Sequence, residues 1–257
     1  MKYLNNVSYK DCVGKVCKSK SSGDFKVLKY NNVRNVEIQF INTGYRKVAE
    51  MKEVRKGEVK DPYSPSVYGV GILGTKYPHS EGGRNTKWYN LWYNMLKRCY
   101  SNIYQKKYPT YEGCEVSDNF KSYEYFYEWC HKQIGFSNQD WHLDKDLLVK
   151  GNKVYSESTC VFLPQEINKM LTKSNALRGE HLIGVHWCNT KKAFVAQVAK
   201  GKGKQKNLGS FNTELEAFDA YKQAKESFIK EQANEFKSQI DERAYEALMN
   251  YTAEISD

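Results

Sequence analysis

The sequence contains no long apolar segment. No run approaches the roughly 18 apolar residues that cross a bilayer, and the opening residues MKYLNNVSYKDC lack the apolar core of a signal peptide. The mean hydropathy is only -0.76. We therefore expect a soluble, intracellular protein with no membrane partner, folded around several small hydrophobic cores.

Paired cysteines are also lacking. The seven cysteines are odd in number and form no CxxC motif, which argues against a disulfide framework and for reduced thiols in a cytosol. Four of them could bind zinc together with His131 if residue type alone decided: Cys99, Cys114, Cys130 and Cys160. Their wide spacing favours burial in separate cores, so we do not expect zinc.

Acidic residues are outnumbered by basic ones. The chain has 40 Lys and Arg against 30 Asp and Glu, a formal charge of +10. Such a charge favours a polyanionic partner, nucleic acid first, although it also serves solubility alone. The distribution of the charge has to separate these interpretations.

Proline is scarce, and most of it lies with several glycines in residues 61–87, which we expect to be an irregular linker. Before this linker, apolar and polar residues alternate around Phe25, Val27, Val36 and Ile38. A period of two is typical of half-buried strands, so residues 1–60 predict a small antiparallel, β-barrel-like domain.

Residues 88–178 predict a helical and strand–strand–helix region. Trp88, Leu91, Trp92 and Met95 have helical spacing, and a second helix follows from about Phe120. After these helices, two strands are predicted at 142–149 and 154–162, and a helix begins at Pro164.

The last part of the chain predicts three strands and two helices. Strands in residues 179–230 are followed by a helix that Thr213 caps, with Glu216 completing a capping box. A further helix is expected at 234–251, within a final segment 231–257. The chain as a whole is predicted to be α+β, ending in a three-stranded antiparallel sheet with a helix.

The pattern of residues 184–224 resembles the APETALA2-type DNA-binding domain. It is carried by Gly184-Val185, the strand 194–198, Leu208-Gly209-Ser210-Phe211 and the alanine-containing helix 216–224. The resemblance implies a sheet that enters the major groove of double-stranded DNA, with contacts from His186, Phe194 and Gln197. We expect the same face and its rim to carry further basic residues: Lys192, Lys200, Lys204 and Lys206.

The middle of the chain resembles a degenerate HNH (ββα-metal) motif of bacteriophage homing endonucleases. The resemblance is carried by Leu143-Asp144-Lys145-Asp146, Gly151-Asn152-Lys153, residues 159–162 and Glu166-Ile167-Asn168. It implies that Asp144 and Asn168 bind Mg²⁺ or Mn²⁺. Lys145 stands where the family has its histidine, and Thr159 stands where it has an asparagine.

His142 is a candidate replacement for the missing catalytic base, because residues two apart on a strand share a face. Asp146 shares that face by the same parity. The candidate catalytic residues are therefore His142, Asp144, Asp146 and Asn168. The candidate metal ligands among them are Asp144, Asp146 and Asn168. The alternative is a solvated strand edge whose aspartates pair with nearby lysines.

Three functional hypotheses follow. The first is a DNA-binding protein of the bacteriophage type in the cytoplasm of a bacterial host cell. The second adds a metal-dependent homing or nicking endonuclease activity. The third is a catalytically inactive factor that binds a host protein.

Overall fold

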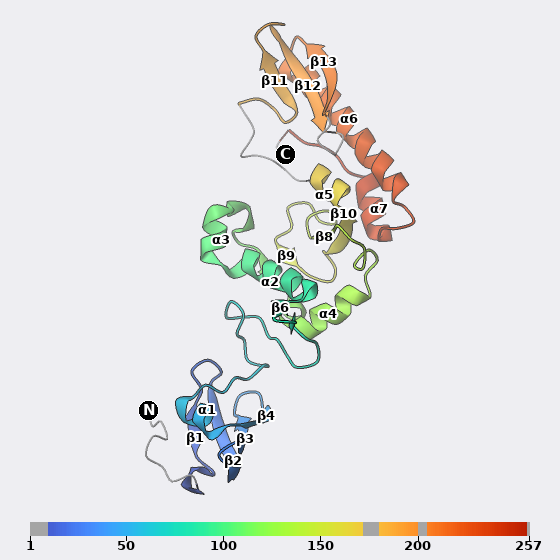
Figure 1. Cartoon of the computed structure of the whole chain (residues 1–257). Helices are drawn as coiled ribbons and strands as arrows, with labels where there is room; N and C mark the ends of the chain where they lie inside the picture. Colours follow the sequence, from blue (N-terminus) through green and yellow to red (C-terminus); the bar gives the residue numbers. More distant parts are fainter. Residues whose placement is uncertain (1–9, 172–179, 200–204, 256–257) are drawn as a thin grey trace. The chain divides into compact units, whose positions relative to one another are not determined.

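A computed structural model describes residues 10–171, 180–199 and 205–255, and it has mixed α and β structure (Figure 1). The chain divides into two compact units, which meet between Glu128 and Trp129. That boundary falls inside the predicted region 88–178, and the finer division predicted from the sequence stays a prediction. Within the described ranges, no helix is long and apolar enough to cross a membrane.

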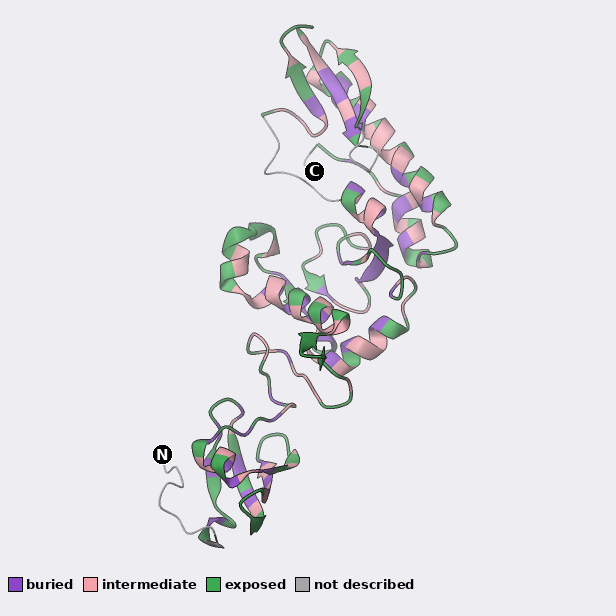
Figure 2. Ribbon diagram, in the orientation of Figure 1, coloured by how far each residue is buried: buried purple, intermediate pink, exposed green. Residues whose placement is uncertain are grey.

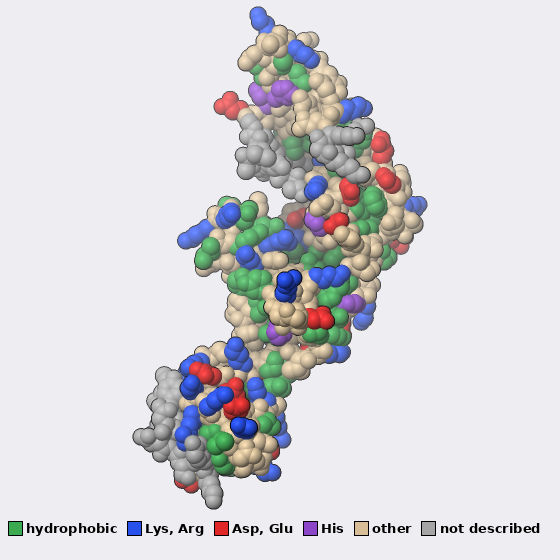
Figure 3. All heavy atoms as spheres, in the orientation of Figure 1, with side chains coloured by type: hydrophobic (Ala, Val, Ile, Leu, Met, Phe, Trp, Pro, Cys, Tyr) green, Lys and Arg blue, Asp and Glu red, His purple; other side chains and the backbone are tan. Residues whose placement is uncertain are grey.

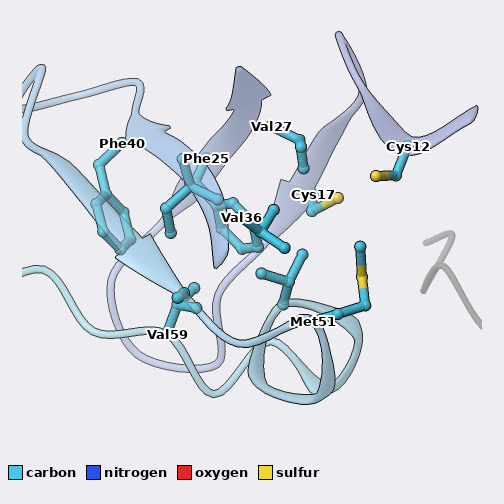
Figure 4. Close-up of a cluster of buried hydrophobic side chains, with 11 residues drawn as sticks. Cys12, Cys17, Phe25, Val27, Val36, Phe40, Met51 and Val59 are labelled. Atoms are coloured by element: carbon cyan, nitrogen blue, oxygen red, sulfur yellow. The ribbon is translucent and has the colours of Figure 1, made fainter. Parts of the chain in front are cut away.

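The first unit begins with a four-stranded antiparallel sheet in the order β1-β2-β3-β4. Its elements are η1 (Lys10–Cys12), β1 (Val16–Lys18), β2 (Asp24–Asn32), β3 (Asn35–Phe40), β4 (Arg46–Ala49) and α1 (Met51–Lys56). The alternating Phe25, Val27, Val36 and Ile38 are fully buried in one core, to which α1 contributes Met51 and Val54 (Figure 4). The predicted strands are confirmed, but the barrel is wrong: the described strands form an open sheet whose core face is covered by α1.

Residues 57–86 are mostly irregular, as predicted. Their only described strands are β5 (Ser80–Glu81) and β6 (Arg84–Asn85), a short hairpin. The apolar stretch around Gly71 is nevertheless packed, because a Cβ added at Gly71 would lie 2.5 Å from Leu96 and 2.8 Å from Trp92. This segment is therefore fixed to the helix that follows it.

Helices dominate the rest of the first unit. The elements are α2 (Lys87–Tyr100), α3 (Asn102–Lys107), η2 (Pro109–Tyr111), β7 (Glu115–Val116), η3 (Asn119–Lys121) and the start of α4 (Tyr123–His131). Thr86 caps α2 by accepting a hydrogen bond from the backbone N–H of Tyr89. The indole of the fully buried Trp92 donates to the carbonyl of Phe120 at 2.8 Å, so the aromatic stripe of α2 is core, as the periodicity predicts.

The second unit contains two packed groups of elements that share one long helix. The first comprises β8 (Trp141–Asp144), β9 (Val154–Tyr155), β10 (Val161–Pro164), α5 (Gln165–Leu171) and α7 (Glu242–Met249). The second comprises β11 (Val185–Cys188), β12 (Ala193–Ala199), β13 (Gln205–Phe211) and the helix α6 (Glu214–Glu235). Figure 2 shows burial concentrated on β10 and on the middle strand β12.

The long helix α6 contributes to both cores. Ala217, Phe218 and Tyr221 pack against the sheet β11–β13, whereas Ile229 and Ala233 pack with α5 and α7. The predicted capping box is present, since Thr213 accepts from the N–H of Glu216 and the Glu216 carboxylate accepts from the N–H of Thr213. The final helix differs from its predicted bounds of 234–251: α6 runs through Glu235, and α7 begins after a new cap at Asp241.

Candidate functional site

The three-stranded sheet β11–β13 has two chemically different faces. Cross-strand partners in antiparallel sheets share a face, and the register pairs Trp187 with Phe194 and Phe194 with Phe211. Phe194 and Phe211 pack against the cluster formed with α6, so this row lies on the helix side. The neighbouring row of His186, Val195 and Ser210 therefore lies on the opposite face, which we call the outer face.

Uncharged polar side chains dominate the outer face. His186, Ser210 and Asn207 are exposed, and Gln197, the cross-strand partner of Asn207, is half-buried. Val195 lies at the centre of the face and is only 2% exposed, because these neighbours surround it. Imidazole, amide and hydroxyl groups are thus held on one side of the sheet, where they offer both hydrogen-bond donors and acceptors.

Phe194 does not share this face with His186 and Gln197, contrary to the expectation that all three line the groove. Its ring packs on the helix side, where it meets Trp187 and His181 edge-to-face at centroid distances of 4.9 and 5.5 Å. The physical reason is the period of two: Phe194 and Gln197 are three residues apart and therefore point to opposite sides.

Lys206 also departs from the expected face. It is paired with the buried Val198, and its ammonium lies 5.7 Å from the ring centroid of Phe228 on α6. A cation over an aromatic face is attracted to the ring quadrupole, so this lysine is directed toward the helix side.

Of the other three predicted lysines, the structure describes one. Lys192 is exposed in the turn between β11 and β12 with φ of 49°, and Lys191 is exposed beside it. Lys200 and Lys204 lie outside the described residues. Of the predicted lysines that the structure describes, Lys192 therefore lies at a turn and Lys206 on the helix side, and neither lies on the outer face.

Sequence reasoning missed Asn207, Ser210 and Lys191. Asn207 was hidden because the register shifts between Ala196 and Gln197, where a bulge places Asn207 opposite Gln197. Ser210 could have been found from strict alternation with Phe211. Lys191 adjoins the predicted Lys192 and shares its turn.

The second candidate site lies on a strand–strand–helix element. Strands β8 and β10 are antiparallel, with His142 opposite Leu163 and Asp144 opposite Val161, and α5 follows β10 directly. Asn168 of α5 brings its amide nitrogen to 3.3 Å from Nδ1 of His142. The structure thus joins two of the four predicted catalytic residues across the strand and the helix.

Asp144 serves the local backbone. Its Oδ1 accepts hydrogen bonds from the N–H groups of Asp146 at 2.9 Å and Leu147 at 2.7 Å, which closes the turn after β8. Removal of water around this carboxylate, opposed by those two hydrogen bonds, raises the pKa of Asp144 above its usual range. Strand β8 also ends here, five residues before the predicted end at Val149.

Asp146 is engaged by a neighbouring lysine. The ammonium of Lys145, which is only 6% exposed, pairs with the carboxylate of Asp146 and also donates to the carbonyl of Asn152 at 2.8 Å. Lys145, which replaces the family histidine, therefore holds the turn between β8 and β9 together. The pair of Lys145 and Asp146 agrees with the alternative in which the aspartates pair with lysines, whereas Asp144 accepts backbone hydrogen bonds instead.

The predicted metal set does not fit a divalent cation in this arrangement. A hard cation needs several oxygen ligands directed at one point, but Asp144 accepts backbone N–H groups and Asp146 pairs with Lys145. Across the residues that the structure describes, no three His, Cys, Asp or Glu side chains gather as a metal-binding group. We therefore derive no catalytic step through a metal ion.

The four widely spaced cysteines are all buried, as predicted, but Cys130 lies close to Cys160, so these two do not belong to separate cores. Burial raises the pKa of the Cys160 thiol to about 12, and burial together with the neighbouring Cys160 raises the pKa of Cys130. His131 packs against Phe136 with ring centroids 4.8 Å apart. These thiols act as small apolar core residues.

Comparison of the chain with protein-family models, with curated proteins and with solved structures finds no match.

Proposed function

We propose that the protein binds double-stranded DNA through the outer face of β11–β13. The observation that carries the proposal is a set of hydrogen-bonding side chains on the face opposite α6. The set comprises His186 and Ser210 on either side of Val195, and the cross-strand pair of Gln197 and Asn207. The major groove admits a sheet of this kind, and amide side chains form bidentate hydrogen bonds with adenine.

Phosphate contacts are assigned to lysines that follow β11 and β12 in the sequence. Lys191 and Lys192 occupy the described turn between β11 and β12, and the sequence supplies Lys200, Lys202 and Lys204 between β12 and β13. Lysines beside a groove face bind the backbone and set the register, whereas the amides read bases. Affinity should therefore depend strongly on salt, and sequence preference on Gln197 and Asn207.

Fluorescence anisotropy with labelled duplexes, repeated across salt concentrations, tests the proposal. Substituting Lys191→Gln and Lys192→Gln should flatten the slope of log affinity against log salt by about 0.9 for each lost phosphate contact. The matched pair Lys132→Gln and Lys230→Gln, two exposed lysines elsewhere in the same unit, should leave the slope unchanged. Equal slopes for both pairs would reject the assigned face.

The amide residues need a separate test. We expect Gln197→Ala with Asn207→Ala to reduce the preference for a selected binding sequence over random duplex by tenfold or more, since each good bidentate contact discriminates by about 1–3 kcal/mol. Gln223→Ala with Gln239→Ala removes two exposed amides outside the sheet and serves as the control. Retained preference in the first variant would contradict base reading by this face.

Endonuclease activity is a second candidate, favoured by one observation: the contact between His142 and Asn168 on a strand–strand–helix element. A supercoiled plasmid incubated with Mg²⁺ or Mn²⁺ tests it. Relaxation by the wild-type chain that is lost in His142→Ala and in Asn168→Ala would support the activity. An intact plasmid under both metals would leave DNA binding alone.

A further inference from the structure

A second cationic surface lies in the other unit, remote in sequence from the sheet β11–β13. We call it the α2–α3 lobe and define it as residues 97–111, from the end of α2 through α3 and η2. Between Glu81 and Glu112 the sequence contains no acidic residue. Lys97, Arg98, Lys106 and Lys107 therefore give the lobe a charge of one sign.

The lobe is held in shape by its own polar and aromatic contacts. The side-chain amide of Gln105 lies within hydrogen-bonding distance of three backbone carbonyls, 3.2 Å from Arg98, 2.7 Å from Cys99 and 3.2 Å from Tyr111. The ring of Tyr104 lies 4.7 Å from Tyr108 and 5.8 Å from Tyr111 between centroids. Gln105 thereby ties α3 both to the end of α2 and to η2.

Aromatic rings orient the cations of the lobe. Lys97 lies 5.1 Å from the ring centroid of Tyr104, Arg98 lies 5.5 Å from that of Tyr111, and Lys107 lies 5.4 Å from that of Tyr108. These contacts restrict the side chains while leaving Lys106 and Lys107 exposed. Figure 3 shows basic and apolar side chains together over α3.

An apolar side chain projects from the same helix. Ile103, in the first turn of α3, is 86% exposed, more than any other large hydrophobic residue described. Its neighbours Lys106 and Lys107 follow three and four residues later, so they lie near it on the helix surface. A partner that contacts Ile103 and these cations together has to offer both negative charge and an apolar interior.

Duplex DNA has this combination. Lysines bind its phosphates, and proteins that bend DNA insert Ile, Leu, Met, Phe or Pro between base steps from the minor groove. We propose that the α2–α3 lobe is a second duplex-binding site, in which Ile103 inserts between base pairs while Lys106 and Lys107 contact the flanking phosphates. The proposal rests on the DNA binding assigned to β11–β13, and two linked sites would raise the overall affinity.

The test uses the full chain and duplexes that carry 2-aminopurine at successive positions. Wild-type protein should raise the 2-aminopurine fluorescence at one base step, because insertion unstacks the base. Ile103→Ser should abolish this rise and leave the dependence of affinity on salt unchanged. Lys106→Gln with Lys107→Gln should flatten the salt slope, with Lys132→Gln and Lys230→Gln as the control.

The outcomes separate the two proposals. If the wild type binds duplex but the lobe variants match it in affinity, salt slope and fluorescence, the lobe proposal is wrong and the sheet proposal stands. If the wild type binds no duplex, both are wrong. A third outcome would overturn the lobe proposal in favour of a lipid surface. In this outcome the wild type sediments with phosphatidylserine vesicles, Ile103→Ser does not, and the two proteins bind DNA equally well.

Discussion

Gly184 and Tyr221 approach each other so closely that no side chain fits between them. A Cβ added at Gly184 would lie 2.1 Å from Cδ2 of Tyr221, and the backbone of Gly184 has φ of 76°. Because Tyr221 belongs to α6 and Gly184 precedes β11, this contact seats the first strand on the helix. It thereby orients the outer face of the sheet.

Gly184→Ala should destabilise the second unit by more than the backbone strain alone. A left-handed conformation costs a residue with a Cβ about 1–2 kcal/mol, and the collision with Tyr221 adds to it. Gly151→Ala is the matched control, with φ of 75° and nothing within 4 Å. Urea denaturation should show a larger loss of unfolding free energy for Gly184→Ala than for Gly151→Ala. Equal losses would show that the contact with Tyr221 does not stabilise the unit.

Phe194 should contribute to stability and not directly to DNA contact, since it packs on the helix side. We expect Phe194→Ala to lower the free energy of unfolding by up to about 3 kcal/mol and Phe194→Leu to lower it less. Duplex affinity, measured well below the melting temperature, should change little in either variant. A hundredfold loss of affinity in a folded Phe194→Leu protein would place the ring in the interface.

Removal of the amino-terminal cap of α6 should have a smaller effect on stability. Thr213→Ala removes the hydroxyl that accepts from the N–H of Glu216, and it should cost about 1 kcal/mol. Thr213→Ser keeps that acceptor and should be close to wild type. Thermal unfolding measures both, and identical midpoints for the Ala and Ser variants would mean that the cap is not stabilising.

At Asp144, removing the charge and removing the hydrogen-bond acceptor should change the stability of the fold in opposite directions. Asp144→Asn keeps an oxygen for the N–H groups of Asp146 and Leu147, whereas Asp144→Ala leaves both without their acceptor and should cost about 1–3 kcal/mol. The raised pKa means that the neutral carboxyl stabilises the fold below the unfolded-state pKa, and this contribution is lost as the pH rises through the folded-state value.

The stability of Asp144→Asn relative to wild type should therefore increase as the pH rises from 4 toward neutrality, because the amide carries no charge at any pH. Urea titrations of the two proteins at several pH values measure this difference. A difference independent of pH would contradict the raised pKa. A wild type that gains stability relative to Asp144→Asn as the pH rises would contradict the direction of the pKa shift.

Periodicity was enough to predict most elements of the fold. The alternation of Phe25 and Val27 identified a strand, and the spacing of Trp92 and Met95 identified a buried helix face, because these periods follow directly from backbone geometry. Thr213 and Glu216 marked the start of α6 for an equally local reason. The open shape of the first sheet was not predictable, since closure depends on strand pairing rather than on any local pattern.

The candidate sites were only partly predictable. Asn207 escaped detection because the bulge in the β12–β13 register leaves no mark in the residue types. Asp144 was predicted as a metal ligand from the family resemblance and Asp146 from strand parity with it, but β8 ends at Asp144, so parity no longer applies to Asp146. The contact between His142 and Asn168 was not itself predicted, because His142 was chosen from strand parity and Asn168 from the family resemblance.

Side-chain amide signals provide the most direct test of the outer face. In heteronuclear NMR spectra of the full chain, addition of duplex DNA should shift or broaden the NH₂ signals of Gln197 and Asn207. Those of Gln223 and Gln239, which lie outside the sheet, should stay in place. Shifts confined to the control residues, with Gln197 and Asn207 unaffected at saturating duplex, would contradict DNA binding by this sheet.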